Sequence, residues 1–166
     1  MRYPLFLDLT KQSAVVVGAG SVATRKIRTL LRAEATVTVI SPQATASIRR
    51  LAQTKRVHWM RRRYRRGDLH GARLAIAATD DPAVNQSVCT EAKRRNLLVN
   101  CITSPNAGNF LVPSLVRRGG ISLAISTGGA SPAFAKRLRV DLEHFLGDEY
   151  PLLLKAMSAA RRAKKA

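Results

Sequence analysis

The sequence predicts an α/β protein: a Rossmann-type, doubly wound parallel sheet, followed by a small strand-containing region and a C-terminal helical segment. Two observations predict this class. Apolar, β-branched runs alternate with amphipathic stretches from Ser13 to Asn100, an order typical of a parallel sheet with helices between its strands. A glycine-rich turn follows the first of these runs, where a dinucleotide-binding sheet places one. After Asn100 the pattern changes to a hairpin and then helices.

The strands of the parallel sheet are predicted from short apolar runs, the first of which stops at glycine as a buried parallel strand does. These runs are residues 13–17, 36–40, 57–60, 74–78 and 97–100. Three helices are predicted between them, and they span residues 22–32, 43–52 and 81–95. The third helix begins at Asp81-Pro82, and proline is tolerated there because the first turn of a helix has no partner for its N–H groups.

The second part of the chain begins with two strand-like runs, residues 110–116 and 121–126, and the Gly119-Gly120 pair between them suits a hairpin turn. Ser131-Pro132 then predicts a helix start, with serine as N-cap and proline at the first helical position. One stripe of that helix carries large apolar side chains: Phe134, Leu138, Leu142 and Phe145.

Gly147 is predicted to end this helix, residues 150–160 to form a last helix, and the basic tail 161–165 to fray in solvent. The predicted division of the chain therefore has three parts. They are residues 1–112, the doubly wound domain, residues 113–147, the strand-containing region with the following helix, and residues 148–166, a short basic helical tail.

The composition narrows the class of partner. The 166 residues include 29 Lys and Arg against 10 Asp and Glu, a net charge of +19, and 46% are apolar. That apolar content supports a packed core, and the charge favours a polyanionic partner. No run of 18 apolar residues is present, so no membrane association is expected. Cys89 and Cys101 form neither a disulfide framework nor a metal motif, which predicts a reducing, cytoplasmic location.

The strongest basic run, Lys55–Arg66, contains Trp59 and Tyr64, a combination that superficially suggests nucleic-acid binding. A solvated edge strand protected by charge is the preferred interpretation, and no nucleic-acid partner is predicted. The three histidines have no metal-ligand spacing, so no metal site is predicted.

The glycine turn, Gly18–Ala23, carries the first chemical motif. Gly18 permits a tight turn, Gly20 lets the backbone approach a pyrophosphate, and Ala23 allows close packing of the helix on the strand. The helix that begins at Ser21 and Val22 supplies amide donors and the positive end of its dipole. Its position between a strand and a helix favours dinucleotide binding over a turn without a ligand.

Two further strand ends border the predicted cofactor. The end of the second strand holds Ser41-Pro42 where an Asp or Glu would select NAD over NADP, so the residues themselves leave that choice open. The fourth strand ends at Thr79 and Asp80, which are predicted to border the cofactor. Asp81 has two interpretations of equal weight, a site residue or a cap of the next helix.

The third motif is the loop Ser126–Pro132, where two glycines lead into a helix N-terminus. Such a loop can cradle an anion with its backbone N–H groups, and its hydroxyl groups add donors. The alternative is an ordinary cap and turn.

Taken together and in this order, the motifs resemble one known family. The matching stretches are an opening apolar segment, the glycine turn and its flanks, and four later segments: Pro4–Leu9, Val15–Lys26, Ala77–Pro82, Val99-Asn100, Phe110–Pro113 and Ile125–Pro132. The sequence is similar to the precorrin-2 dehydrogenase family, which includes sirohydrochlorin ferrochelatases and the N-terminal module of multifunctional siroheme synthases. The resemblance covers about residues 3–146.

The resemblance implies an NAD-dependent oxidation of precorrin-2, an anionic tetrapyrrole, to sirohydrochlorin, and a homodimer. It also implies that residues 1–112 are the NAD-binding domain and residues 113–147 the dimerisation and substrate region. Some members also insert Fe²⁺, so ferrochelatase activity is left open. The residues that by this match border NAD are Gly18, Gly20, Ser21, Val22, Ser41, Pro42, Thr79 and Asp80. Those that face the tetrapyrrole are Asn100, Thr127, Gly128 and Ser131.

The sequence departs from the family in two ways. Many members carry an aspartate, proposed as the acid/base, where this chain has Thr103, and residues 100–109 contain no carboxylate. The catalytic residue is therefore unassigned, with Asp80 as a weak candidate, and iron insertion is affected more than hydride transfer. Many single-function relatives also have a longer C-terminus. The missing carboxylate and the absence of an acidic residue at the end of the second strand favour one alternative function, a non-catalytic dinucleotide-binding sensor or regulatory module.

Overall fold

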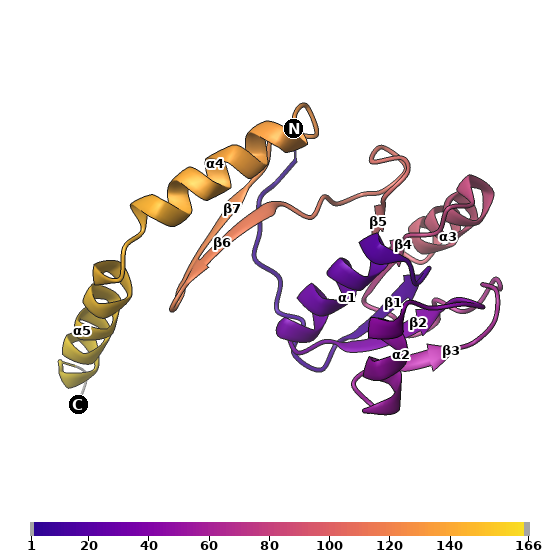
Figure 1. Cartoon of the computed structure of the whole chain (residues 1–166), viewed down its shortest axis with the longest axis horizontal. Helices are drawn as coiled ribbons and strands as arrows, with labels where there is room; N and C mark the ends of the chain where they lie inside the picture. The colour runs from indigo at the N-terminus through magenta and orange to yellow at the C-terminus, as the bar shows by residue number, and fades with distance from the viewer. Residues whose placement is uncertain (1, 165–166) are drawn as a thin grey trace. The chain divides into compact units, whose positions relative to one another are not determined.

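The computed structural model describes residues 2–164, which form two compact units, one ending at Leu111 and one beginning at Val112 (Figure 1). The first unit contains a five-stranded sheet of order β3-β2-β1-β4-β5, in which every neighbouring pair is parallel. Its strands are β1 (Ser13–Val17), β2 (Thr36–Ile40), β3 (His58–Met60), β4 (Leu74–Ala77) and β5 (Leu98–Cys101). The predicted doubly wound parallel sheet is confirmed.

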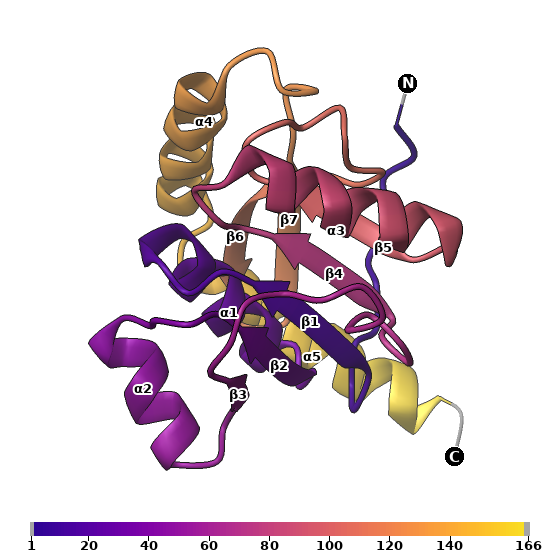
Figure 2. The same ribbon diagram turned by 90° about the vertical axis from the view of Figure 1, so that its right-hand side faces the viewer.

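Helices cover both faces of this sheet: α1 (Ser21–Arg32), α2 (Ala46–Gln53) and α3 (Pro82–Arg94). Side chains alternate along each strand, so Val16 of β1 packs on the face that carries α1 and α2, whereas Val15 packs on the face that carries α3 (Figures 1 and 2). Ile27 of α1 and Val88 of α3 are fully buried in these two cores. Because all neighbouring strands are parallel, the carboxyl ends of the five strands lie at one edge of the sheet.

The second unit is an antiparallel hairpin followed by two helices. Its elements are β6 (Ser114–Arg118), β7 (Ile121–Ile125), α4 (Pro132–Phe145) and α5 (Glu149–Ala163). The predicted Gly119-Gly120 turn is confirmed, because Arg118 pairs with Ile121 and Gly119 adopts a φ of +57° that a side chain would disfavour. Ser131 caps α4 and Pro132 is its first residue, as predicted. No helix within residues 2–164 is long and apolar enough to cross a membrane.

Two predicted boundaries are wrong, and in each case a side-chain hydrogen bond explains the difference. The helix predicted from residue 43 begins at Ala46, because the hydroxyl of Thr45 accepts the Ile48 N–H and caps it there. The strand predicted at 110–116 begins at Ser114. The side chain of Asn109 instead accepts from Val99 N–H at 2.7 Å and donates to the Leu97 carbonyl at 2.8 Å, so this segment is held against β5 as a loop.

The predicted fraying of the basic tail is also wrong where the structure describes it, because α5 continues through Ala163; Lys165 lies outside the described residues. The apolar side chains of α5 are exposed, and Leu152 and Met157 are each 63% accessible to solvent. Phe134 and Phe145 of the predicted α4 stripe are exposed as well.

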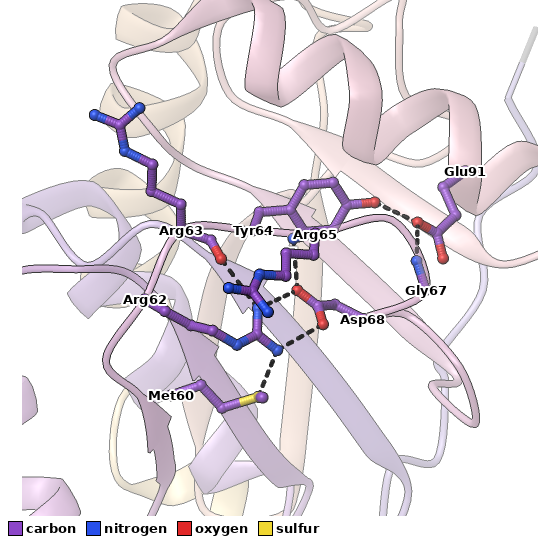
Figure 3. Close-up of polar contacts among 8 residues, drawn as sticks. All are labelled: Met60, Arg62, Arg63, Tyr64, Arg65, Gly67, Asp68 and Glu91. Carbon is purple, nitrogen blue, oxygen red and sulfur yellow. Dashed lines mark hydrogen bonds and ion pairs between the residues drawn. The ribbon is translucent and has the colours of Figure 1, made fainter.

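The basic run is not a continuous edge strand, contrary to the prediction. The strand ends at Met60, and Arg62 turns inward to make two 2.7 Å hydrogen bonds to the carboxylate of Asp68 (Figure 3). The side chain of Arg63 points away from this network. The Arg62 guanidinium lowers the pKa of Asp68. The loop is therefore an ordered crossover between β3 and β4.

A buried carboxylate anchors the same loop to α3. Glu91 is only 6% exposed and accepts hydrogen bonds from the Tyr64 hydroxyl and from Gly67 N–H at 2.9 Å (Figure 3). It also accepts from Arg95 at 2.9 Å. Burial opposes ionisation of Glu91, but these hydrogen bonds outweigh it and lower the pKa of its carboxyl group. Burial, reinforced by the Glu91 carboxylate, raises the pKa of Tyr64. The loop and the helix thus share one ionised, hydrogen-bonded centre.

Candidate dinucleotide-binding site

The turn after β1 requires glycine at its first position. Gly18 has a φ of +109°, and a Cβ placed on it would lie 2.1 Å from the carbonyl oxygen of Ala78. Its N–H donates to the Ile40 carbonyl at 2.9 Å, which ties the turn to the end of β2. The turn therefore packs directly against the loop that follows β4, and no larger residue fits.

Gly20 is different, because nothing within residues 2–164 requires glycine there. Its φ of −77° suits any residue, and an added Cβ would meet no atom within 4 Å among the described residues. Gly20 is the N-cap of α1, and no side chain in the described chain caps that helix. The space in front of Gly20 and the N–H groups that begin with Ser21 and Val22 are therefore suited to an external anion such as a pyrophosphate.

A pair of threonines fixes the other side of the turn, and the sequence did not predict them. The Thr24 hydroxyl donates to the Gly20 carbonyl at 2.8 Å and lies 3.1 Å from the Thr45 hydroxyl. The Thr45 N–H donates to the Ala19 carbonyl at 3.2 Å. Thr24 is 8% exposed and lies on the buried side of α1. A polar residue among apolar helix positions is the one sign of this pair that the sequence offers.

The end of β2 presents a hydroxyl where a carboxylate would discriminate against a 2′-phosphate. The backbone of Ser41 is held by β3, through its N–H to the Met60 carbonyl at 3.2 Å and through its carbonyl to the Trp59 indole N–H at 2.9 Å. Pro42, which follows, is exposed. The Arg61 guanidinium lies 5.7 Å from the centre of the Trp59 ring.

The residues of the loop after β4 have different surroundings and roles. The Asp81 carboxylate accepts from the Ala83 and Val84 N–H groups and caps α3, so the capping interpretation of Asp81 is confirmed. Asp80 is exposed at the carboxyl edge. The Thr79 hydroxyl bonds to Asn85 at 2.9 Å and to the Asp81 carbonyl at 3.0 Å.

At the end of β5, Asn100, which is predicted to face the substrate, and Thr103, which stands where many family members carry an aspartate, have different surroundings. Asn100 is 5% exposed and its amide donates to the Phe110 carbonyl at 3.1 Å, a contact that holds the following loop. Thr103 is exposed, and its hydroxyl oxygen accepts from the Asn85 amide at 3.2 Å. Thr103 is thus a hydroxyl at the strand ends with access to solvent.

In the second unit, the loop before α4 is closed by its own hydroxyl groups. The Thr127 hydroxyl bonds to both the N–H and the carbonyl of Ser131, at 3.1 and 3.2 Å, and the Ser131 hydroxyl caps α4 by accepting from Phe134 N–H. Gly128 and Gly129 have φ values of +67° and +98°, which only glycine adopts readily. The loop is therefore a preformed cap whose exposed glycine backbone is its free surface.

Two surface hollows of the first unit, of about 710 and 620 Å³, lie elsewhere. The larger is lined by the end of α1, the start of β2 and β3, and the smaller by α1 and α2. Neither contains a predicted site residue. The candidate site is the open carboxyl edge of the sheet, where a doubly wound fold binds ligands.

The fold and the glycine turn define a dinucleotide-binding Rossmann protein, and comparisons with known proteins agree. A family model described as putative NAD(P)-binding matches residues 5–114. A second, described as the central part of a sirohaem biosynthesis protein, matches residues 118–144.

Named relatives match nearly the whole chain. A precorrin-2 dehydrogenase of Bacillus subtilis (strain 168) is 32% identical over 161 residues, which cover 97% of this chain and 99% of the relative. A siroheme synthase of Chromobacterium violaceum is 36% identical over 164 residues, but this chain spans only 35% of its length. A solved structure of SirC, a precorrin-2 dehydrogenase, superposes with a TM-score of 0.83 at 34% identity, covering 96% of this chain and 79% of that one.

The chain belongs to the precorrin-2 dehydrogenase family, whose NAD(P)-binding domain it contains.

Proposed function

We propose that this protein catalyses the NAD-dependent oxidation of precorrin-2 to sirohydrochlorin in siroheme biosynthesis. The observation that carries the proposal is the turn at Gly20, an open space at a helix N-terminus with no structural reason for glycine. Similarity along nearly the full length of a precorrin-2 dehydrogenase supports the substrate.

The residues of the first unit fit a dinucleotide in a definite order. The N–H groups at Ser21 and Val22 hold the pyrophosphate, and Ser41 and Pro42 border the adenine ribose. We infer NAD⁺ as the cofactor because the two guanidinium groups after β3 already have partners, Arg61 over Trp59 and Arg62 on Asp68. A 2′-phosphate therefore finds no uncommitted arginine in that pair.

The oxidation removes two hydrogens from the macrocycle, and bound NAD⁺ supplies the acceptor for the hydride. Thr79 and Asp80 border the cofactor on the β4 side, and Asp80 is the candidate acceptor for the released proton. The Thr103 hydroxyl and the buried Asn100 line the substrate side of β5, and the loop of Thr127, Gly128 and Ser131 offers backbone donors to substrate carboxylates.

The direct test mixes purified protein with precorrin-2 and NAD⁺ and follows sirohydrochlorin absorbance together with NADH. We expect one NADH per sirohydrochlorin, and a kcat/KM with NADP⁺ that is lower by about tenfold or more. Fe²⁺ added afterwards is expected to be inserted no faster than without protein, because residues 100–109 lack a carboxylate to accept the pyrrole protons. NAD⁺ binding without turnover would instead indicate the sensor.

We propose that residues 113–147 and α5 mediate a homodimer. Isolated two-stranded hairpins are marginal in water, and α4 and α5 expose a set of large apolar side chains on this unit. These are Phe134, Phe145, Leu152, Leu153, Leu154 and Met157. A second copy of the chain would remove them from water.

Substituting charge into this apolar surface is expected to separate the copies. Leu152→Lys together with Met157→Lys should convert a dimer to a monomer in light scattering coupled to gel filtration, because each lysine would have to be desolvated. Lys155→Ala, an exposed change on the same helix, is the control and should remain dimeric. A wild-type protein that is monomeric at micromolar concentration would refute the dimer.

We also propose a reducing, cytoplasmic location. Cys89 and Cys101 are free thiols, and each is at most 3% exposed. Burial raises the pKa of the Cys89 thiol to about 12, so it is present as the thiol and not as the thiolate. Such thiols act as small core residues.

A further inference from the structure

One buried amide joins the two loops that border the candidate site. Asn85 lies in the first turns of α3 and is completely buried. Its amide oxygen accepts from the N–H of Thr79 at 3.1 Å and from the Thr79 hydroxyl at 2.9 Å. Its amide nitrogen donates to the Thr79 carbonyl at 2.8 Å and to the Thr103 hydroxyl at 3.2 Å. Both hydrogens of the side chain are therefore used, and its oxygen accepts the Thr79 N–H and shares the single Thr79 hydroxyl hydrogen with the Asp81 carbonyl.

The loops that Asn85 joins follow two adjacent strands. Thr79 follows β4 and Thr103 follows β5, so Asn85 spans the carboxyl edge at the point where these strands end. The Thr79 side of this contact continues to the cofactor turn, because the Ala78 carbonyl and the Thr79 backbone are what a Cβ on Gly18 would strike. One side chain thus supports the floor of the dinucleotide turn and a hydroxyl exposed at the edge.

The chemistry of the amide suits this task. An asparagine offers two donors and two acceptors in one plane, whereas aspartate offers no donor when ionised and leucine offers neither. The Thr103 oxygen accepts from Asn85, and its other side-chain partner among the described residues is the Cys101 thiol at 3.5 Å, a weak one. The Thr103 hydroxyl hydrogen can therefore be donated to a ligand at the strand ends.

We propose that Asn85 is a positioning residue that fixes the Thr79 loop and the Thr103 loop in one arrangement, so that dinucleotide affinity and presentation of the Thr103 hydroxyl to the substrate depend on the same amide. The substrate half of this inference rests on the proposed function. The dinucleotide half does not, because it concerns only the loop beneath Gly18.

The test measures NAD⁺ affinity by calorimetry and precorrin-2 oxidation by steady-state kinetics. Asn85→Asp keeps the shape but loses both donors, and it should weaken NAD⁺ binding and lower kcat, each by about tenfold or more. Thr103→Val should lower kcat by about tenfold with NAD⁺ affinity within about twofold of wild type. Thr103→Ser, which restores the hydroxyl, should recover kcat.

The double variant decides whether the two residues act as one unit. If Asn85 works on the substrate through Thr103, the loss in kcat for Asn85→Asp with Thr103→Val should stay within about threefold of Asn85→Asp alone. A loss equal to the product of the two single losses would overturn the coupling. So would a Thr103→Val variant with wild-type kcat, a result that needs no Asn85 variant to fold.

A matched control separates the charge from the position. Asn96→Asp makes the same chemical change at an exposed residue just after α3, and it should alter neither affinity nor kcat. If the wild type binds NAD⁺ but does not oxidise precorrin-2, the proposed function fails. The NAD⁺ affinities of wild type and Asn85→Asp, measured by calorimetry, still test the role of Asn85 in dinucleotide binding. Unchanged NAD⁺ affinity in a folded Asn85→Asp protein would overturn the positioning role.

Discussion

Replacing Gly20 with aspartate is expected to abolish dinucleotide binding while the protein stays folded. The backbone φ of −77° accepts an L-residue, and the new Cβ would meet no atom within 4 Å, so the fold has no reason to change. The new carboxylate would lie in front of the α1 N-terminus, in the space that the pyrophosphate is proposed to occupy. Both groups are negatively charged and would repel each other. Repulsion of several kcal/mol predicts a loss of NAD⁺ affinity of about 100-fold or more.

The measurement is NAD⁺ titration by calorimetry beside a thermal melt of each variant. Gly20→Ala is the matched control: it adds bulk without charge and should weaken binding less than aspartate does. Gly18→Ala should instead destabilise the fold, by about 2–3 kcal/mol. Gly18 has a φ of +109°, and a Cβ at this position would clash with the Ala78 carbonyl. A Gly20→Asp protein that binds NAD⁺ like wild type would show that the cofactor lies elsewhere.

Glu91→Gln is expected to cause the largest loss of stability among changes away from the site. The carboxylate is 6% exposed and receives donors from Tyr64, Gly67 and Arg95. A glutamine amide offers a single acceptor oxygen and turns N–H groups toward donors, leaving at least one of them unpaired. We expect a loss of about 2–3 kcal/mol, discounted for the partly exposed Arg95, which lowers the melting temperature by roughly 10 °C.

The pH dependence gives this prediction a second readout. The folded-state pKa of Glu91 is lowered, so its contribution is fully present above the unfolded value of about 4.3 and is lost as the pH falls through the folded value. The difference in stability between wild type and Glu91→Gln should therefore be constant from pH 7 to about 5 and shrink at more acidic pH.

Two further variants test the assignment to the buried network. Tyr64→Phe removes one donor and should cost about 1 kcal/mol. Arg63→Ala removes an exposed side chain that points away from the network, and it should change stability by less than about 0.5 kcal/mol (Figure 3). Equal effects of Arg63→Ala and Glu91→Gln would contradict the anchoring role of the carboxylate.

Much of the fold could be predicted because its signals are short-range. The apolar residues of β1 and β4 all lie in the interior, as the burial of Val15 to Val17 shows. The glycine turn, the Ser131-Pro132 helix start and the Gly119-Gly120 hairpin each depend on the preferences of neighbouring residues. These features also indicated the cofactor edge, since the turn at Gly18 and Gly20 identifies where β1 ends and α1 begins.

Two of the wrong predictions involve a partner farther along the chain. The strand predicted at residues 110–116 begins only at Ser114, because the side chain of Asn109 pairs with Leu97 and Val99 and holds the preceding segment against β5 as a loop. The basic run leaves the sheet because Tyr64 reaches Glu91, 27 positions later. No local pattern announces either pairing.

The sequence by itself determined the doubly wound sheet, the glycine turn and the family that these motifs resemble, because propensity and periodicity are properties of adjacent residues. Only the tertiary structure decided that Asn85 joins Thr79 to Thr103 and that packing requires glycine at position 18 but not at position 20. It also decided that Glu91 anchors the loop between β3 and β4. Each of these depends on which segments meet in space, and the partner of a buried polar group is set by the packing of the whole chain.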